Sequence, residues 1–138
     1  PAHAPMLLRM RELARWLQAR LREASPSMPP MRAGFHAVPS MRQLHLHVLS
    51  SDFSSACLKS KRHYNSFATD FFVPLDAVLG QLGAHGRVAI DAFAEEAKLK
   101  AEMRCMLSGR VLKNMPALKE HVASEAYRAL LRGRADEV

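Results

Sequence analysis

Long apolar runs and cysteine are scarce in this 138-residue sequence, and lysine is absent before Lys59. No stretch approaches the roughly 18 consecutive apolar residues of a membrane-spanning helix, so we expect no membrane partner. Two cysteines, Cys57 and Cys105, are too few for a disulfide framework and indicate a reducing compartment. The N-terminal residues lack the basic, apolar and small-residue segments of a secretory signal peptide. Because the first residue is Pro1, we expect either a processed chain or a fragment.

What is present is an ordinary globular composition with a basic surplus. Hydrophobic residues make up 49% and charged residues 24%, which excludes wholesale disorder. Twenty lysines and arginines against 13 acidic residues give a net charge of +7, which favours nucleic acid, nucleotides or an acidic surface as partner. The densest basic cluster is Lys59, Lys61 and Arg62 beside His63. A solvated loop is the alternative interpretation of that cluster.

Apolar periodicity and breaker residues predict a mixture of helices and short strands. Helices are expected over 6–24, 74–82, 93–103 and 116–132. Strands are expected over 35–38, 43–50 and 87–91, with loops over 25–34 and 51–69. In the first helix the predicted apolar stripe consists of Met10, Leu13, Ala14, Leu17 and Leu21.

The segment Gln43–Ser50 alternates between polar and apolar side chains. On a strand, Leu44, Leu46 and Val48 share one face, while His45 and His47 lie on the other, about 7 Å apart. Two imidazoles on one face suggest a metal site, a phosphate site or a structurally satisfied pair. A metal site needs a third ligand that the strand does not supply. A phosphate site fits better, because one imidazole can attack phosphorus while a second stabilises the developing charge.

Four segments together resemble a known family. They are FHAVPSM at 35–41, LHLHV at 44–48, DF at 52–53 and LKSKRHYNSF at 58–67. The sequence is similar here to the aprataxin branch of the histidine-triad superfamily of nucleotide hydrolases and transferases. The resemblance implies an α+β fold, with a histidine-triad antiparallel sheet and helices followed by a small zinc-finger-like helical unit.

That resemblance also implies a DNA-repair hydrolase that removes AMP from the 5′-adenylated ends left by abortive ligation. His45 matches the family's nucleophile, which forms a covalent adenylyl-histidine intermediate. His47, His36 and Ser50 match residues that hold the phosphate. The DNA-binding residues implied are Lys59, Lys61 and His63. The expected partner is DNA at adenylated ends and nicks, the product is AMP, the location is nuclear, and catalysis needs no metal or organic cofactor.

Two departures from the family pattern accompany the resemblance. Gln43 stands where the first histidine of the triad is usual, and its amide still offers a hydrogen bond. Family members also place early strands before the helix expected at 6–24. We therefore expect residues 1–103 to be a catalytic domain that lacks its N-terminal part.

The C-terminal unit, expected over 104–138, has the spacing of a Cys2His2 zinc finger. Its pattern is Cys105-x2-Ser108-x12-His121-x3-Glu125. Ser108 and Glu125 stand in the places of two usual ligands, which leaves Cys105 and His121. The sequence therefore predicts a degenerate finger that binds no structural zinc.

Two other functions stay open. A non-catalytic DNA-binding fragment would use the basic loop and the finger-like unit. A general histidine-triad hydrolase would act on small adenylyl substrates, although the basic stretch 58–67 has little use there. Release of AMP from adenylated DNA, from small adenylates or from neither would distinguish the three.

Overall fold

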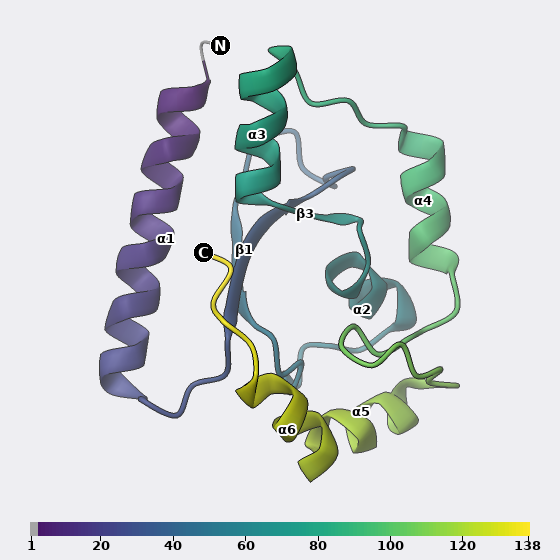
Figure 1. The fold of residues 1–138 in the computed structure, drawn as a ribbon. Helices are drawn as coiled ribbons and strands as arrows, with labels where there is room; N and C mark the ends of the chain where they lie inside the picture. The colour runs from purple at the N-terminus through teal and green to yellow at the C-terminus, as the bar shows by residue number, and fades with distance from the viewer. Residues whose placement is uncertain (1–2) are drawn as a thin grey trace.

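A computed structural model describes residues 3–138 (Figure 1). The helices are α1 (Ala4–Ala24), α2 (Lys61–Ala68), α3 (Leu75–His85), α4 (Ala92–Lys100), α5 (Met115–Ala123) and α6 (Glu125–Arg132). The strands are β1 (Met31–His36), β2 (His47–Ser50) and β3 (Phe72–Pro74). The α+β class and antiparallel sheet are confirmed. No helix among the described residues combines the length and apolarity needed to cross a bilayer.

Strand β1 lies in the centre of the sheet, in the order β2-β1-β3. Gly34 is opposite His47 on one edge of β1 and opposite Pro74 on the other. The position needs glycine because an added Cβ would lie 2.5 Å from the Val73 carbonyl oxygen and 2.8 Å from the Phe72 ring. This close approach lets β2 and β3 flank the same short strand.

The two faces of the sheet carry separate apolar clusters. Figure 1 shows the helices that surround the sheet. On one face, Phe35 packs with Leu7 of α1 and with Leu75 and Val78 of α3. The other cluster joins the segment after β2 to the C-terminal helices. Its buried members are Phe53, Leu58, Tyr64, Met103, Cys105, Leu112, Leu118, Val122, Tyr127 and Leu131. The boundary expected at 103/104 stays a prediction, but this core contains residues from both sides of it.

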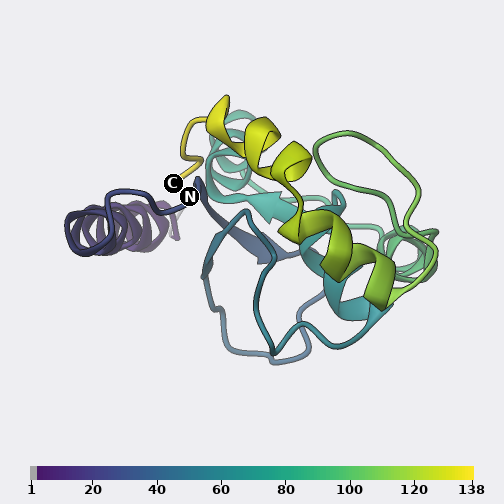
Figure 2. The ribbon, with the colours of Figure 1, turned by 90° about the horizontal axis from the view of Figure 1, so that it is seen from below.

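Helix α1 differs from its predicted packing. Leu7 and Ala14 are buried, whereas Leu13 and Leu17 of the expected stripe are 51% and 38% exposed. The stripe faces α3 and β1 with only one of its sides. Leu13 and Leu17 stay exposed because α1 lies at the periphery of the molecule, as Figure 2 shows from below.

Several element predictions were wrong. Residues 31–34, expected to be loop, begin β1, and the predicted loop 51–69 contains α2. The strand expected over 43–50 forms only from His47 onward, because its pairing with β1 ends at Gly34. Residues 87–91 form no strand.

The helix expected over 116–132 is interrupted at Ser124. Its hydroxyl accepts from Tyr127 N–H and donates to the His121 carbonyl, so Ser124 starts α6 as an N-cap. The break turns α6 away from α5.

The C-terminal residues return to the sheet. Ala33 N–H donates to the Glu137 carbonyl at 2.9 Å, and Glu137 N–H donates to the Met31 carbonyl at 2.7 Å. Asp136 accepts from Arg22 of α1. These bonds occupy the part of β1 that β3 does not reach.

We expect Gly34→Ala to lower the free energy of unfolding by about 1–3 kcal/mol, because the new Cβ would overlap the Val73 carbonyl. Urea unfolding followed by circular dichroism would measure it. The matched control is Gly80→Ala, in α3 and with nothing within 4 Å, which should be neutral or stabilising. Equal effects of the two substitutions would contradict the steric explanation.

Candidate active site: a histidine cluster

Three histidines converge at one end of the sheet. His36 is the last residue of β1, His47 is the first of β2, and His45 lies just before β2. The ring centroids of His36 and His47 are 4.3 Å apart, and those of His45 and His47 are 5.0 Å apart. The antiparallel register brings His36 and His47 together, since His47 pairs with Gly34 and His36 follows Gly34 two residues later on the same face.

Aromatic side chains surround the histidines. Phe67 of α2 lies 4.6 Å from His36 and 5.2 Å from His47, centroid to centroid, and Phe71 lies 5.3 Å from His36. His63 contacts Phe67 from the preceding turn of α2 at 5.6 Å. The sequence analysis did not identify these phenylalanines, although the spacing of His63 and Phe67, i and i+4, placed them on one helix face.

Burial lowers the pKa of two imidazoles in the cluster and so favours their neutral form. Burial, and then repulsion from His47, lowers the pKa of His36 to about 4. Burial, and then repulsion from His45, lowers the pKa of His47. The Nε2 atoms of His36 and His47 are buried without a hydrogen-bond partner among the described residues. Buried ring nitrogens of this kind are suited to a ligand that brings its own polar atoms.

His45 has a defined tautomer. Its Nδ1 lies 2.8 Å from the Gln43 carbonyl oxygen, which can only accept, so Nδ1 carries the proton. In the neutral ring this tautomer leaves a lone pair on Nε2, the form that a nucleophilic imidazole requires. The backbone of Gln43 makes this contact, so the replacement of a histidine side chain there does not affect it.

The structure does not bring Ser50 to the histidines. Ser50 pairs with Met31 at the other end of the β1–β2 ladder, and its hydroxyl donates to Asp52 at 2.6 Å. Strand alternation also points Ser50 and His47 to opposite faces.

The predicted DNA-binding residues lie around the start of α2. Lys59 is exposed, and His63 is exposed beside Phe67. Lys61 donates from Nζ to the Lys100 carbonyl at 2.8 Å. Arg62 forms a bidentate ion pair with Glu96. Part of the basic cluster therefore connects α2 to α4.

Asn65 is a structural residue that the sequence analysis missed. It is buried, and its Nδ2 contacts the carbonyls of Lys98, Leu99 and Ala101 at the end of α4. Nothing in the spacing of the sequence indicated this long-range cap. It helps to hold α2, which carries Phe67, against α4.

The finger-like unit lacks converging zinc ligands. Cys105 is buried and accepts a weak hydrogen bond from Ser108 N–H at 3.4 Å. Glu125 points to Arg132, with Nη2 to Oε1 at 2.7 Å, and also pairs with Arg128. Residues 3–138 contain no group of three His, Cys, Asp or Glu side chains arranged to hold a metal. The residues present do not fit a tetrahedral zinc site, and the absence of zinc stays a prediction.

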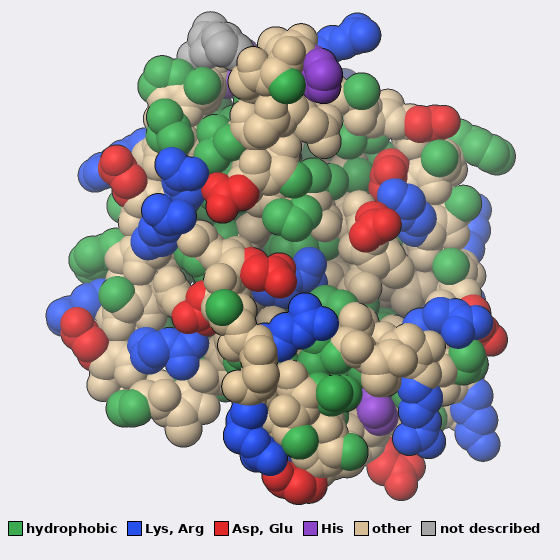
Figure 3. Space-filling view, in the orientation of Figure 1, with side chains coloured by type: hydrophobic (Ala, Val, Ile, Leu, Met, Phe, Trp, Pro, Cys, Tyr) green, Lys and Arg blue, Asp and Glu red, His purple; other side chains and the backbone are tan. Residues whose placement is uncertain are grey.

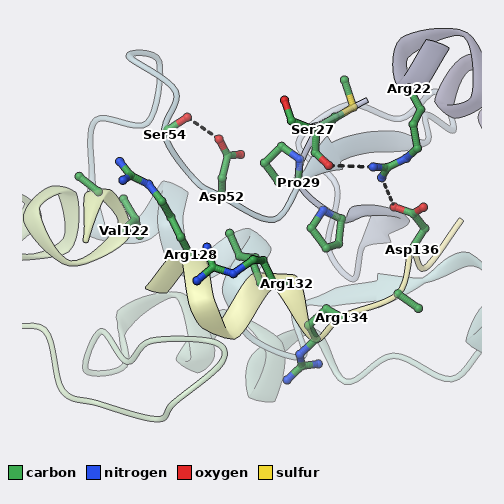
Figure 4. Close-up of a pocket in the computed structure, with 15 residues that line it drawn as sticks. Arg22, Ser27, Pro29, Asp52, Ser54, Val122, Arg128, Arg132, Arg134 and Asp136 are labelled. Atoms are coloured by element: carbon green, nitrogen blue, oxygen red, sulfur yellow. Dashed lines mark hydrogen bonds and ion pairs between the residues drawn. The ribbon is translucent and has the colours of Figure 1, made fainter. Parts of the chain in front are cut away.

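A cavity of about 950 Å³ lies at the other end of the molecule, between α6 and the segment after α1 (Figure 4). Arg22, which is paired with Asp136, lines it together with Arg128, Arg132 and Arg134. Arg134 has no ion pair within residues 3–138. Figure 4 shows Asp52, held by Ser54, on the opposite wall. The histidines do not line this cavity.

An antiparallel sheet with a cluster of histidines at one end, backed by helices, defines the histidine-triad class. Residues 1–63 match the family model described as scavenger mRNA decapping enzyme C-term binding. Residues 68–127 match the C2HE / C2H2 / C2HC zinc-binding finger. The roles assigned to Ser108 and Glu125 in this unit stay predictions.

The chain belongs to the aprataxin family. It is 46% identical over 91 residues to aprataxin of Gallus gallus, covering 66% of this chain and 28% of that protein, and shows the same values for aprataxin of Danio rerio. It thus spans just over a quarter of these curated relatives.

Solved structures agree in fold. The aprataxin ortholog Hnt3 from Schizosaccharomyces pombe superposes with a TM-score of 0.68 and 25% identity, over 96% of this chain and 68% of Hnt3. Hnt3 in complex with DNA gives a TM-score of 0.62, also at 25% identity, over 94% of this chain and 71% of that chain.

Lowering the pH should reduce the free energy of unfolding as the pH falls from about 6.5 towards 4. Unfolded His36 binds a proton with its ordinary pKa of 6.5, whereas folded His36 stays neutral until about 4, so acid favours the unfolded chain. Urea unfolding at a series of pH values would measure the slope. His36→Asn should flatten it, and the same change at exposed His85 should not. An unchanged slope in His36→Asn would contradict the assignment.

Proposed function

We propose that this chain removes AMP from 5′-adenylated DNA ends, with His45 as the nucleophile. The observation that carries the proposal is the contact of His45 Nδ1 with the Gln43 carbonyl, which in the neutral ring directs the Nε2 lone pair away from the backbone, with the His47 ring centroid 5.0 Å away. A neutral nucleophile flanked by buried, unpartnered ring nitrogens suits attack on an anionic phosphate. The chain covers only part of its relatives, so this activity is inferred from the site.

The reaction has two balanced steps. His45 Nε2 attacks the phosphorus of the adenylate, the bond to the bridging oxygen of the pyrophosphate breaks, and DNA leaves with a free 5′-phosphate. Water then attacks the adenylyl-histidine, which releases AMP and a proton and restores the imidazole. His47, whose ring centroid lies 5.0 Å from that of His45, is placed to stabilise the non-bridging oxygens, and His36 lies next to His47 at 4.3 Å. Imidazole supplies the nucleophile, so the proposed chemistry uses no metal or organic cofactor.

Recognition of DNA is supported by charge. The net charge is +7, and Lys59 projects unpaired among the described residues beside the helix that carries His63 and Phe67. Lysine ammonium groups and exposed arginines attract phosphates without reading sequence. A nuclear location would follow from a DNA substrate. Hnt3, with the same fold, was solved in complex with DNA and guanosine.

The alternative is a histidine-triad hydrolase of small adenylyl compounds. The same histidine geometry favours it, because His45 can attack phosphorus whether the leaving group is DNA or a small molecule. A non-catalytic DNA-binding fragment is the third possibility. The zinc-free finger that we infer is compatible with this function as well as with the other two. AMP release from an adenylated nick, from a small adenylate or from neither distinguishes them.

We expect His45→Ala to lower AMP release from a nicked 5′-adenylated duplex by at least about 10³-fold, because the attacking nitrogen is lost. Affinity for the duplex should stay near its starting value. Chromatography of released AMP and fluorescence anisotropy of the duplex measure the two. His85→Ala, an exposed histidine at the end of α3, is the control and should keep both. Full activity of His45→Ala would refute the nucleophile.

Lys59→Ala should weaken DNA binding and reduce the slope of log K against log salt by about 0.9, because one phosphate contact is lost. Anisotropy titrations at several salt concentrations measure the slope. Lys98→Ala removes the same charge from a lysine already paired with Glu95 at 2.7 Å, and should change the slope less. The role of Lys59 would be excluded if both variants gave the wild-type slope.

A further inference from the structure

The outer face of α1 is apolar and uncovered. Trp16 is 63% exposed, Leu13 is 51% exposed, and Met6 and Leu17 lie beside them at 44% and 38%. Figure 2 shows α1 at the edge of the molecule, with one side turned away from all other elements. Several exposed apolar side chains on one helix, including a tryptophan, indicate an interaction surface.

The arginines of α1 fall into two groups. Arg11, Arg15 and Arg22 face the body of the molecule, where they bind Asp76, the Val138 carbonyl and Asp136. Arg9 and Arg20 face outward and pair only within the helix, with Glu12 and Glu23, at 2.8 Å each. The four outward charges are 63–70% exposed.

These four charges are placed symmetrically about Trp16. Arg9 and Glu23 are seven residues on either side of it, and Glu12 and Arg20 are four residues on either side. At 3.6 residues per turn, all four lie within about 40° of Trp16 around the helix axis. Figure 3 shows the result along the edge formed by α1, where an acidic and basic pair, an apolar patch and a second such pair follow one another.

Positions related by symmetry about Trp16 carry opposite charges, and this determines how two α1 helices can pair. If a second α1 lies antiparallel across the first, with the two Trp16 side chains at the twofold axis, each Arg9 meets a Glu23 and each Glu12 meets an Arg20. Every outward charge then faces its opposite, and Leu13 and Leu17 pack around the tryptophans. A parallel arrangement in register would instead place each charge against itself.

We propose that α1 is the contact surface of a homodimer, paired antiparallel with α1 of a second copy through Trp16. A C2 interface requires a self-complementary patch, which this face provides. An acidic membrane or a uniformly charged partner fits less well, because the outward charges balance. One helix pair buries little area, so the expected Kd is on the order of 10 µM.

Two double variants test the pairing without changing net charge or the charge pairing within the helix. The first-half variant is Arg9→Glu with Glu12→Arg, and the second-half variant is Arg20→Glu with Glu23→Arg. In either homodimer all four intermolecular pairs become repulsive. In a mixture of the two variants, all four become attractive again.

Sedimentation equilibrium on the whole 138-residue chain measures the dimer. The wild type should dimerise, each variant alone should raise Kd by at least about tenfold, and the equimolar mixture should restore dimerisation. Trp16 is the sole tryptophan, so its emission should shift to the blue with rising wild-type concentration. Circular dichroism checks that both variants fold. The mixture is a second control, because two misfolded variants would not dimerise when mixed.

Three results would overturn the proposal. The first is a wild type that stays monomeric at 200 µM, roughly twentyfold above the expected Kd, which would mean that this face binds another segment or another protein. The second is dimerisation of both variants with the Kd of the wild type, which would place the contact elsewhere. The third is a mixture that stays monomeric although both variants are folded and the wild type dimerises, which would exclude the antiparallel register.

Discussion

Strand β1 forms hydrogen bonds with β2 on one edge and with β3 on the other, and the histidine site depends on this double pairing. Pairing of Gly34 with His47 places His36 and His47 on the same face, 4.3 Å apart between ring centroids. Pairing of Phe35 with Val73 holds β3 at the other edge of β1, and α3, which follows β3, packs on the face that carries Phe35. Glycine at position 34 is necessary because no Cβ fits beside the Val73 carbonyl. One short strand thus fixes both the histidines and the core behind them.

The finger-like unit is held to the rest of the molecule by packing and by hydrogen bonds. Its core includes Phe53 and Tyr64 from the histidine-bearing part, and Tyr127 of α6 donates to the Ser51 carbonyl at 2.7 Å. Tyr64 likewise donates to the Arg104 carbonyl at 3.0 Å. Two tyrosines therefore connect the parts in both directions. An apolar core with satisfied hydroxyl groups can replace the cross-link that a structural zinc supplies in small domains.

Charge in this protein serves three separate purposes. Arg11, Arg15 and Arg22 fasten α1 to the body, and Arg62 fastens α2 to Glu96 of α4. Lys59 is exposed next to the start of α2. The outward charges of α1 balance one another, which distinguishes that face from the basic surfaces. The net charge of +7 therefore describes the total and does not locate the DNA-binding surface.

The sequence by itself determined the local features. Alternation in 44–48 separated Leu46 from His45 and His47, and periodicity located α1, because these patterns depend on neighbours along the chain. It also determined the family, through the histidine strand and the stretch 58–67. It could not place Phe71 in the site or Asn65 at the end of α4, nor separate the buried from the exposed side of α1, since contacts between distant residues decide these. Only the tertiary structure showed that Gln43 orients His45 through its backbone, that Ser50 lies away from the histidines, and that Arg62 is bound to Glu96. Register and packing have no local signature, because they arise from the energies of many segments folded together.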